Sequence, residues 1–164
     1  MERTQTSRDL AYELLEERIA YLELLKSFHE EVVKIIRIYT SNDSFTAERC
    51  LQEIVNFIQR RFNLYMVSVL LLDDMTRELV LLVAAGEDAA APEVKNCRIR
   101  TGEGLVGTCA RTGETIRVDD VAVDPRYIRG PLPNAQSEVC VPVKVKHRIV
   151  GVLDLEHKVK SHFT

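Results

Sequence analysis

The sequence has 164 residues and a formal net charge of -3, which is enough length for one domain with its own hydrophobic core. Without an excess of basic residues it offers no polycation for nucleic acid or anionic lipid. No apolar run approaches the roughly 20 residues of a membrane span, and we find no signal peptide, so we expect a soluble, cytoplasmic protein. The cysteines, Cys50, Cys97, Cys109 and Cys140, form no CxxC pair, which argues against structural zinc and against a disulfide scaffold.

The first segment, from about Ser7 to Tyr39, has no glycine or proline and is rich in Glu, Lys, Arg, Leu and Ile, so we expect one long helix. Alternating steps of four and three residues give a heptad seam, which predicts a parallel coiled-coil homodimer; a helix packed along its own domain is the alternative. We interpret His29 as a seam residue that sets the register rather than as a phosphoacceptor. The seam is Ala11, Leu15, Arg18, Leu22, Leu25, His29, Val32, Ile36 and Tyr39.

A polar break, Thr40 to Thr46, separates this helix from a second amphipathic segment. The apolar residues of that segment fall on one helical face, which predicts a helix from about Thr46 to Phe62 that packs on a sheet. We therefore divide the chain into a helix-and-break segment, residues 1–45, and a domain, residues 46–164. The apolar residues of the second helix are Leu51, Ile54, Val55, Ile58 and Phe62.

Apolar runs over residues 64–73 and 78–86 predict two strands of a hairpin, and residues 95–100 and 115–119 predict short strands. Residues 137–156, dense in Val, Ile and Leu, predict a central hairpin with a basic tip at Lys146 to Arg148. A three-residue loop there pairs Val145 with Ile149 and Val143 with Gly151, whereas a two-residue loop shifts the register by one. No Gly, Asn or Asp at the tip decides between them. Both faces of this hairpin are apolar, as in a sheet covered on both sides.

Between these strands lie a glycine-rich segment, residues 101–115, and a long irregular segment, residues 120–136. Gly102, Gly104 and Gly107 frame a tight entry into a short helix, and Gly113 supplies a left-handed stop. The segment lacks the Lys-Ser/Thr pair of a P-loop, so it gives only weak support for phosphate binding. Long loops in compact domains usually carry function, which makes residues 120–136 the candidate lid.

The order of elements and several local motifs resemble a GAF domain, the small ligand-sensing module of bacterial signalling proteins. The likeness covers residues 46–156 and implies an α+β fold: a six-stranded antiparallel sheet with helices on one face and a ligand pocket, roofed by loops and a short helix, on the other. Such domains usually continue into a closing helix and an output domain, so we expect a fragment of a longer protein. The resembling motifs are GEGLVG (102–107), ART with GE (110–114), VDDV (118–121), SE followed by VPV (137–143) and IVGVLDL (149–155).

Members of the family bind chemically different ligands, so we compare the sequence motif of each ligand class with the residues of this chain. The Asn-Lys-x-Phe-x-Asp-Glu pattern of cyclic-nucleotide members and the Cys-His pair of bilin-carrying members are both absent. GAF proteins that reduce free methionine-R-sulfoxide are similar over residues 95–154. This likeness implies that Cys97 matches one of their cysteines and that Val106 and Gly130 stand where they carry the other two. A thiolate nucleophile and a resolving thiol are needed for that reduction, so we expect no catalysis.

The likeness to these reductases also implies that Glu138, Asp154 and Glu156 match the acidic cluster that holds a substrate ammonium. We expect a sensory domain with an unidentified small ligand, without metal, haem or bilin, and as a homodimer coupled to an output domain. The alternatives are a thiol enzyme of the methionine sulfoxide type and a dimerisation module without ligand. Cys97, Cys109 and Cys140 are interpreted as packing residues, with redox sensing as the alternative. The candidate ligand-binding residues are Asp119, Asp120, Tyr127, Arg129, Ser137, Glu138 and Asp154.

Overall fold

The computed structural model describes residues 2–40, 46–130 and 134–163, and within the first helix the side chains of residues 2–9, 11, 39 and 40 fall outside the description. The chain divides into two compact units, Met1–Thr46 and Ala47–Thr164. Most of the predicted polar break, residues 41–45, lies outside the described residues. None of the described helices is long and apolar enough to cross a membrane.

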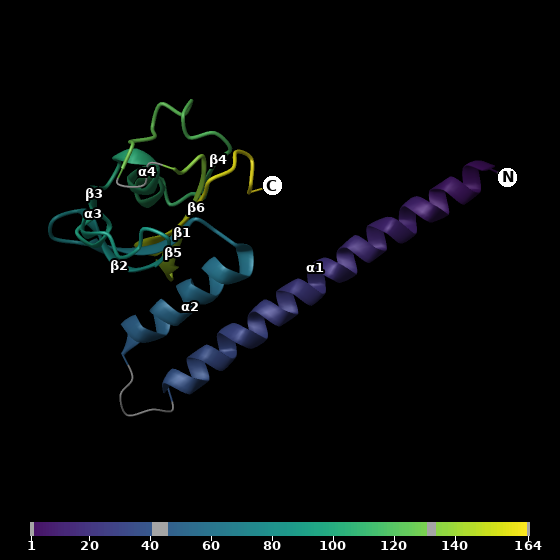
Figure 1. Ribbon diagram of the computed structural model, residues 1–164, viewed down its shortest axis with the longest axis horizontal. Helices are drawn as coiled ribbons and strands as arrows, with labels where there is room; N and C mark the ends of the chain where they lie inside the picture. Colours follow the sequence, from purple (N-terminus) through teal and green to yellow (C-terminus); the bar gives the residue numbers. More distant parts are fainter. Residues whose placement is uncertain (1, 41–45, 131–133, 164) are drawn as a thin grey trace. The chain divides into compact units, whose positions relative to one another are not determined.

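The first unit is a single helix, α1 (Glu2–Thr40), of 39 residues (Figure 1). At 1.5 Å per residue it is about 58 Å long. The absence of glycine and proline accounts for its continuity, because either residue lowers helix stability. The predicted long helix is therefore confirmed, with five more residues at its amino-terminal end. Ala11 and Tyr39 of the predicted seam belong to the side chains outside the description.

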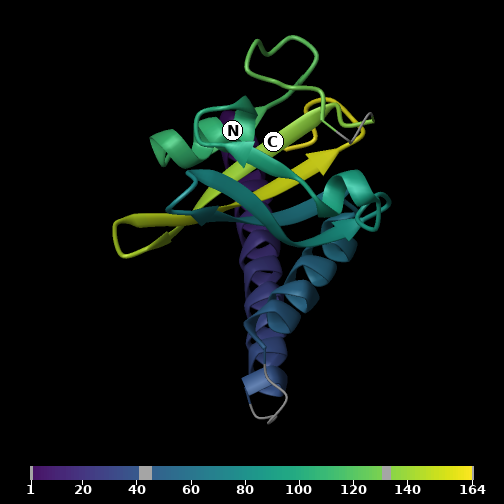
Figure 2. The ribbon, with the colours of Figure 1, turned by 90° about the vertical axis from the view of Figure 1, so that its left-hand side faces the viewer.

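The second unit is built on an antiparallel six-stranded sheet in the order β3-β2-β1-β6-β5-β4 (Figure 2). The two most apolar hairpins meet at its centre, where β1 lies beside β6, and the short strands β3 and β4 form the edges. The prediction of an α+β fold with about six antiparallel strands is confirmed. The strands are β1 (Met66–Asp73), β2 (Glu78–Gly86), β3 (Arg98–Arg100), β4 (Ile116–Val118), β5 (Ser137–Val145) and β6 (Arg148–His157).

The hairpin of β5 and β6 combines the two predicted registers. A two-residue loop joins the strands, so Val145 pairs with Arg148, and the predicted pairing of Val145 with Ile149 is wrong. An irregularity beyond Val143 then restores the pairing of Val143 with Gly151. Such a bulge places an extra residue on one strand, which changes the register on one side of it only. Lys146 has a φ of 58°, the left-handed conformation that a two-residue hairpin loop requires.

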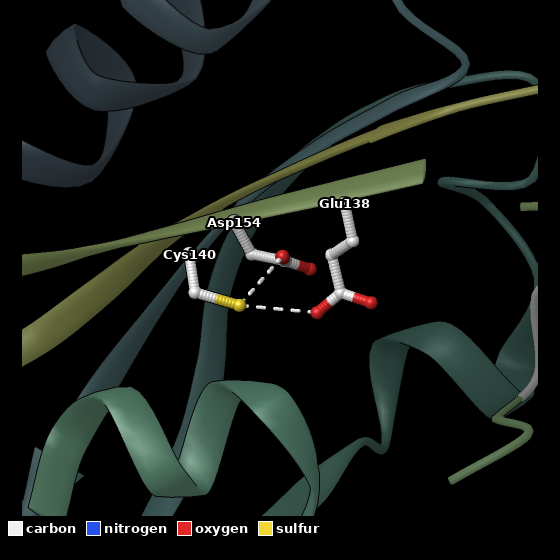
Figure 3. Close-up of side chains that lie close together, drawn as sticks. All are labelled: Glu138, Cys140 and Asp154. Carbon is white, nitrogen blue, oxygen red and sulfur yellow. Dashed lines mark hydrogen bonds between the residues drawn. The ribbon is translucent and has the colours of Figure 1, made fainter. Parts of the chain in front are cut away.

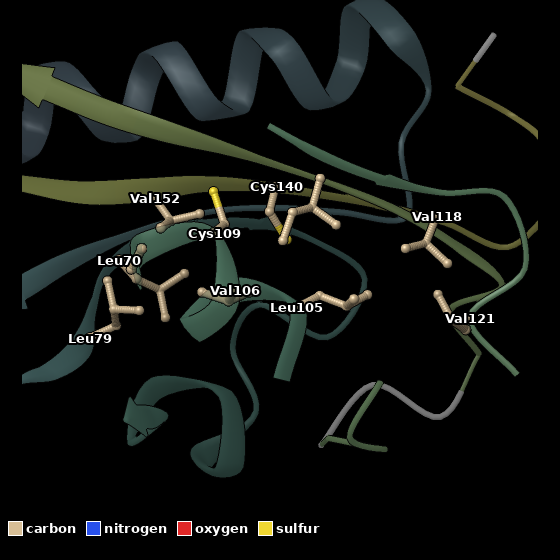
Figure 4. Close-up of a cluster of buried hydrophobic side chains, with 11 residues drawn as sticks. Leu70, Leu79, Leu105, Val106, Cys109, Val118, Val121, Cys140 and Val152 are labelled. Carbon is tan, nitrogen blue, oxygen red and sulfur yellow. The ribbon is translucent and has the colours of Figure 1, made fainter. Parts of the chain in front are cut away.

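Two helices cover opposite faces of the sheet (Figure 2). The helix α2 (Ala47–Phe62) packs on β1 and β2 through its buried residues Cys50, Val55 and Ile58. The other face carries α4 (Gly104–Thr112), and the main core lies between this helix and the strands (Figure 4). A four-residue helix, α3 (Pro92–Lys95), follows β2 and was not expected from the sequence. The proline at its first turn is typical of a helix start, because its missing N–H has no intrahelical partner there.

The position of α4 depends on close backbone packing at Gly107. Its carbonyl oxygen accepts a 2.7 Å hydrogen bond from the N–H of Gly102. A Cβ at Gly107 would stand 2.3 Å from the carbonyl oxygen of Arg100, far inside van der Waals contact. At its other end α4 stops at Gly113, which has a φ of 69°, as predicted for a left-handed helix stop. The glycine-rich segment therefore fixes α4 over the sheet.

Candidate functional site

A cavity of about 260 Å³ lies between the sheet and α4. Its floor is formed by residues of β1, β2, β5 and β6, and its roof by α3, by the first turn of α4 and by Tyr127 and Ile128 of the long loop. Most of the lining is apolar, including Leu81, Val94 and Leu105. A cavity with an apolar lining and a few grouped polar side chains is the usual form of a small-molecule site.

The polar end of the cavity consists of three buried acidic residues, Glu138 on β5 and Asp154 and Glu156 on β6. The register pairs Glu138 with Glu156, and Asp154 with Cys140. Alternate residues of a strand share a face, so all four side chains lie on the cavity side of the sheet. The residues Glu138, Asp154 and Glu156 are only 5%, 5% and 8% exposed. We refer to these three as the acidic cluster.

Hydrogen bonds connect the acidic cluster to Cys140 (Figure 3). The Cys140 thiol donates to Glu138 Oε1 at 3.0 Å and lies 3.5 Å from Asp154 Oδ1. The Asp154 carboxyl group also shares hydrogen bonds with those of Glu138 and Glu156. Since two ionised carboxylates cannot share a hydrogen bond, the cluster retains protons at these contacts.

Burial is the main cause of the shifted pKa values in the cluster, because a charged group is poorly solvated there. It raises the pKa of Asp154 to about 6. The pKa values of Glu138 and Glu156 rise well above the usual range, through burial first and then through repulsion by Asp154.

Within the described lining, the only basic side chain is that of Arg98, and its guanidinium lies 3.6 Å from a carboxylate oxygen of Glu78. Among the described lining residues, therefore, no free cation neutralises the acidic cluster. A cationic group that entered the cavity would supply it.

The structure brings Tyr127, Glu138 and Asp154 together at this cavity, as three of the predicted binding residues. Arg129 lies instead along a separate polar hollow with Asp120 and Asp124. The predicted grouping of Arg129 with Glu138 in one pocket is therefore not observed.

Three other predicted residues make contacts away from the cavity lining. Asp119 lies 3.4 Å from Arg117 in an exposed ion pair. Asp120 accepts from the N–H of Ala122, as in a capped turn, and pairs with Lys160 at 2.7 Å. Ser137 is fully buried, and its hydroxyl donates to the carbonyl oxygen of Val159 at 2.7 Å. These contacts satisfy the polar groups of all three side chains outside the cavity.

The ion pair of Asp120 with Lys160 belongs to a set of contacts that joins the long loop to the end of β6 and to the residues after it. The N–H of Ser161 donates to the carbonyl oxygen of Asp119 at 2.8 Å, beside the ion pair of Lys160 with Asp120. At the end of the loop, the N–H of Gln136 donates to the carbonyl oxygen of His157 at 2.8 Å. The loop that carries Tyr127 is thus held at one end by Lys160 and Ser161 and at the other by His157, the last residue of β6.

The cysteines that the sequence singled out lie at or near the cavity, in surroundings that disfavour a thiolate. Burial raises the pKa of Cys97, which lines the cavity, and the negative charges of Asp154 and Glu156 raise it further. Burial also raises the pKa of Cys109 to about 11 and that of Cys140 well above its usual range. A reactive cysteine needs the opposite, a lowered pKa.

Sequence reasoning missed Ser68, which lies in the floor of the cavity and pairs with Asp154 across β1 and β6. Its signal was present: Ser68 is the one polar residue inside the apolar run 64–72. Glu103 at the start of α4 was also missed. Val106 and Gly130 both line the cavity, so the positions compared with reductase cysteines belong to this site.

A family model described as "GAF domain" matches residues 46–164. The chain belongs to the GAF domain family. Two curated relatives differ in kind. A Nif-specific regulatory protein from Herbaspirillum seropedicae is 28% identical over 146 residues, which cover 85% of this chain and 25% of that protein. The free methionine-R-sulfoxide reductase of Escherichia coli (strain K12) is 36% identical over 67 residues, which cover 41% of this chain and 40% of the enzyme.

Among solved structures, this GAF protein is similar to the free methionine-R-sulfoxide reductase of Neisseria meningitidis in complex with its substrate. The two share 26% identity and a TM-score of 0.70, over 84% of this chain and 77% of the reductase. The chain spans less than half the length of the two curated relatives. The chain is therefore similar both to a regulatory protein and to enzymes.

Proposed function

We propose that this GAF domain is a sensory module that binds a small molecule carrying a positively charged amine. The acidic cluster carries the proposal: three adjoining carboxyl groups, nine-tenths buried, lie at a cavity whose described lining offers no free cation to them. Buried charges are normally paired, because an unpaired one is expensive to desolvate. An ammonium group forms three hydrogen bonds and neutralises the cluster, and the apolar lining suits an aliphatic remainder.

An α-amino acid or related amine is the ligand class that fits best. Free methionine-R-sulfoxide, the compound named for two of the similar reductases, has such an ammonium group. In a sensor, the bound ligand favours one arrangement of Tyr127 and its loop, by as much as its affinities for the two arrangements differ. The regulatory relative supports a signalling role for the domain.

We propose further that the domain does not catalyse sulfoxide reduction. Val106 and Gly130 occupy the cavity positions compared with reductase cysteines. The raised pKa of Cys97 makes its thiol a poor nucleophile. Turnover of free methionine-R-sulfoxide with a thiol reductant tests this directly. Steady turnover would refute the non-catalytic proposal and favour the thiol enzyme.

Calorimetric titration at pH 7 with L-methionine, methionine-R-sulfoxide and simple aliphatic amines tests the sensor proposal. N-acetyl-L-methionine is the matched control, since it keeps the side chain and loses the positive charge. We expect binding of at least one amine, at least tenfold weaker binding of its acetylated form, and loss of binding in Glu138→Gln. Native mass spectrometry of the purified protein, before and after denaturation, adds a search for a ligand retained from the host. Equal affinity for the charged and acetylated forms, or no amine bound by either method, would overturn the proposal.

A further inference from the structure

The surface of α1 carries an unusual number of exposed apolar side chains. Between residues 12 and 25 these include Leu15, Leu22 and Leu25, which are 54%, 51% and 44% exposed. They are three of the predicted seam positions, and they follow one side of the helix at the spacing of a heptad repeat. The other exposed apolar side chains in this stretch are Tyr12, Leu14, Ile19 and Tyr21, between 47% and 66% exposed.

These additional side chains flank the seam on both sides. In the heptad frame set by Leu15, Leu22 and Leu25, the residues Leu14 and Ile19 occupy the positions where coiled coils usually place charged residues. The opposite side of the helix carries acidic and small residues, among them Glu13, Glu16, Ala20, Glu23 and Ser27. One side of α1 is therefore a broad apolar face and the other is a solvated face.

We propose that this apolar face is an interface with a second copy of the same chain, formed helix against helix along α1. Four of every seven residues face the partner in such a pair, so a helix of 39 residues contributes about 22. This lies within the roughly 20–30 residues that a standard interface takes from each partner. A helix that forms a compact unit by itself gains most of its stability from packing of its apolar face. A second copy supplies that packing for both helices at once.

The flanking positions determine how the pair responds to salt. Because they are mainly apolar, ion pairs across the interface contribute little, and screening leaves the association intact. Arg18, the basic seam residue in this stretch, has its guanidinium 5.6 Å from the ring centroid of Tyr21 on the same helix. Its charge thus lies over an aromatic face while its aliphatic stem covers the seam.

Sedimentation and light scattering of the full chain test the interface. We expect twice the 18.7 kDa mass of one chain, unchanged in about 1 M salt. The double variant Leu22→Glu with Leu25→Glu places four charges in the interface and should raise the dimer dissociation constant at least about 1000-fold. The matched control, Ala20→Glu with Ser27→Glu, adds the same charges to the opposite side and should leave the mass unchanged.

Circular dichroism and thermal unfolding show that both variants keep a folded GAF unit. A monomeric wild type would overturn the proposal and favour α1 packed on its own domain. A seam variant that remains dimeric, or a control that dissociates as readily, would overturn it as well. These readouts use no ligand, so they stand apart from the tests of the proposed function.

Discussion

The substitution Asp154→Asn isolates the electrostatic cost of the acidic cluster. The pKa of Asp154 rises from 3.8 to about 6, and one pKa unit corresponds to about 1.4 kcal/mol, so ionisation of this carboxyl group costs the folded state about 3 kcal/mol. Well below pH 3.8 the group is protonated in the folded and unfolded chains, and the penalty is absent; well above pH 6 it is ionised in both, and the penalty is complete. The contribution of Asp154 to stability should therefore fall by about 2 kcal/mol as pH rises from 4 to 7, because the unfolded chain is already partly ionised at pH 4.

The asparagine variant keeps the shape of Asp154 and loses the charge at every pH. We expect its free energy of unfolding, relative to wild type, to be about 2 kcal/mol higher at pH 7 than at pH 4. Comparing the two pH values cancels hydrogen-bond changes that the asparagine introduces at both. Urea unfolding followed by far-UV circular dichroism measures the four free energies.

The matched control is Asp124→Asn at a half-buried ion pair with Arg126. Hydrogen bonding to that arginine lowers the pKa of Asp124, so its contribution is present at neutral pH and is lost as pH falls through the lowered value. The control should therefore lose stability at pH 7 and approach wild type in acid, the opposite sign. A relative stability of Asp154→Asn that falls or stays constant between pH 4 and 7 would refute the unpaired-cluster argument.

Three further predictions address the thiol of Cys97, the packing of α4 at Gly107 and the pairing of two copies of α1. Cys97 should react with iodoacetamide at pH 7 more slowly than a free cysteine, because burial raises the pKa of its thiol; a rate equal to that of glutathione would contradict this. Gly107→Ala should cost about 2–3 kcal/mol in urea unfolding, since its Cβ meets a backbone carbonyl oxygen of β3. Gly130→Ala, whose Cβ would make only an ordinary 3.9 Å contact with the carbonyl oxygen of Ile128, should be neutral; similar losses would rule out the clash. If the two copies of α1 run parallel, Leu15→Cys should form an intermolecular disulfide on mild oxidation, seen on a non-reducing gel, and Ser27→Cys should not.

The sheet was predictable because its strands are long apolar runs separated by polar turns. The tip of the β5–β6 hairpin was not predictable, because Lys146 adopts a left-handed conformation that a lysine does not usually favour. No pattern of residue types distinguishes a loop of two residues followed by a bulge from a loop of three.

The residues of the candidate site likewise include some that could be predicted from the sequence and some that could not. Glu138, Asp154 and Glu156 were identified through a family resemblance, and their alternate spacing on paired strands explains why they meet. The polar residues of the long loop were less predictable, because partners far along the chain compete for them. Asp120, for example, pairs with Lys160, 40 positions along the chain. Nothing in the local sequence around Asp120 indicates that partner.

The attachment of the long loop to residues 158–161 has a mechanical consequence. Tyr127 lies between two anchored points, the contacts at Asp119 and Asp120 and the contact at Gln136. A displacement at either anchored point must break these contacts or move the backbone of residues 157–161 with it. A change at Tyr127 that strains the anchors would therefore also reach the end of β6 and the residues that follow it.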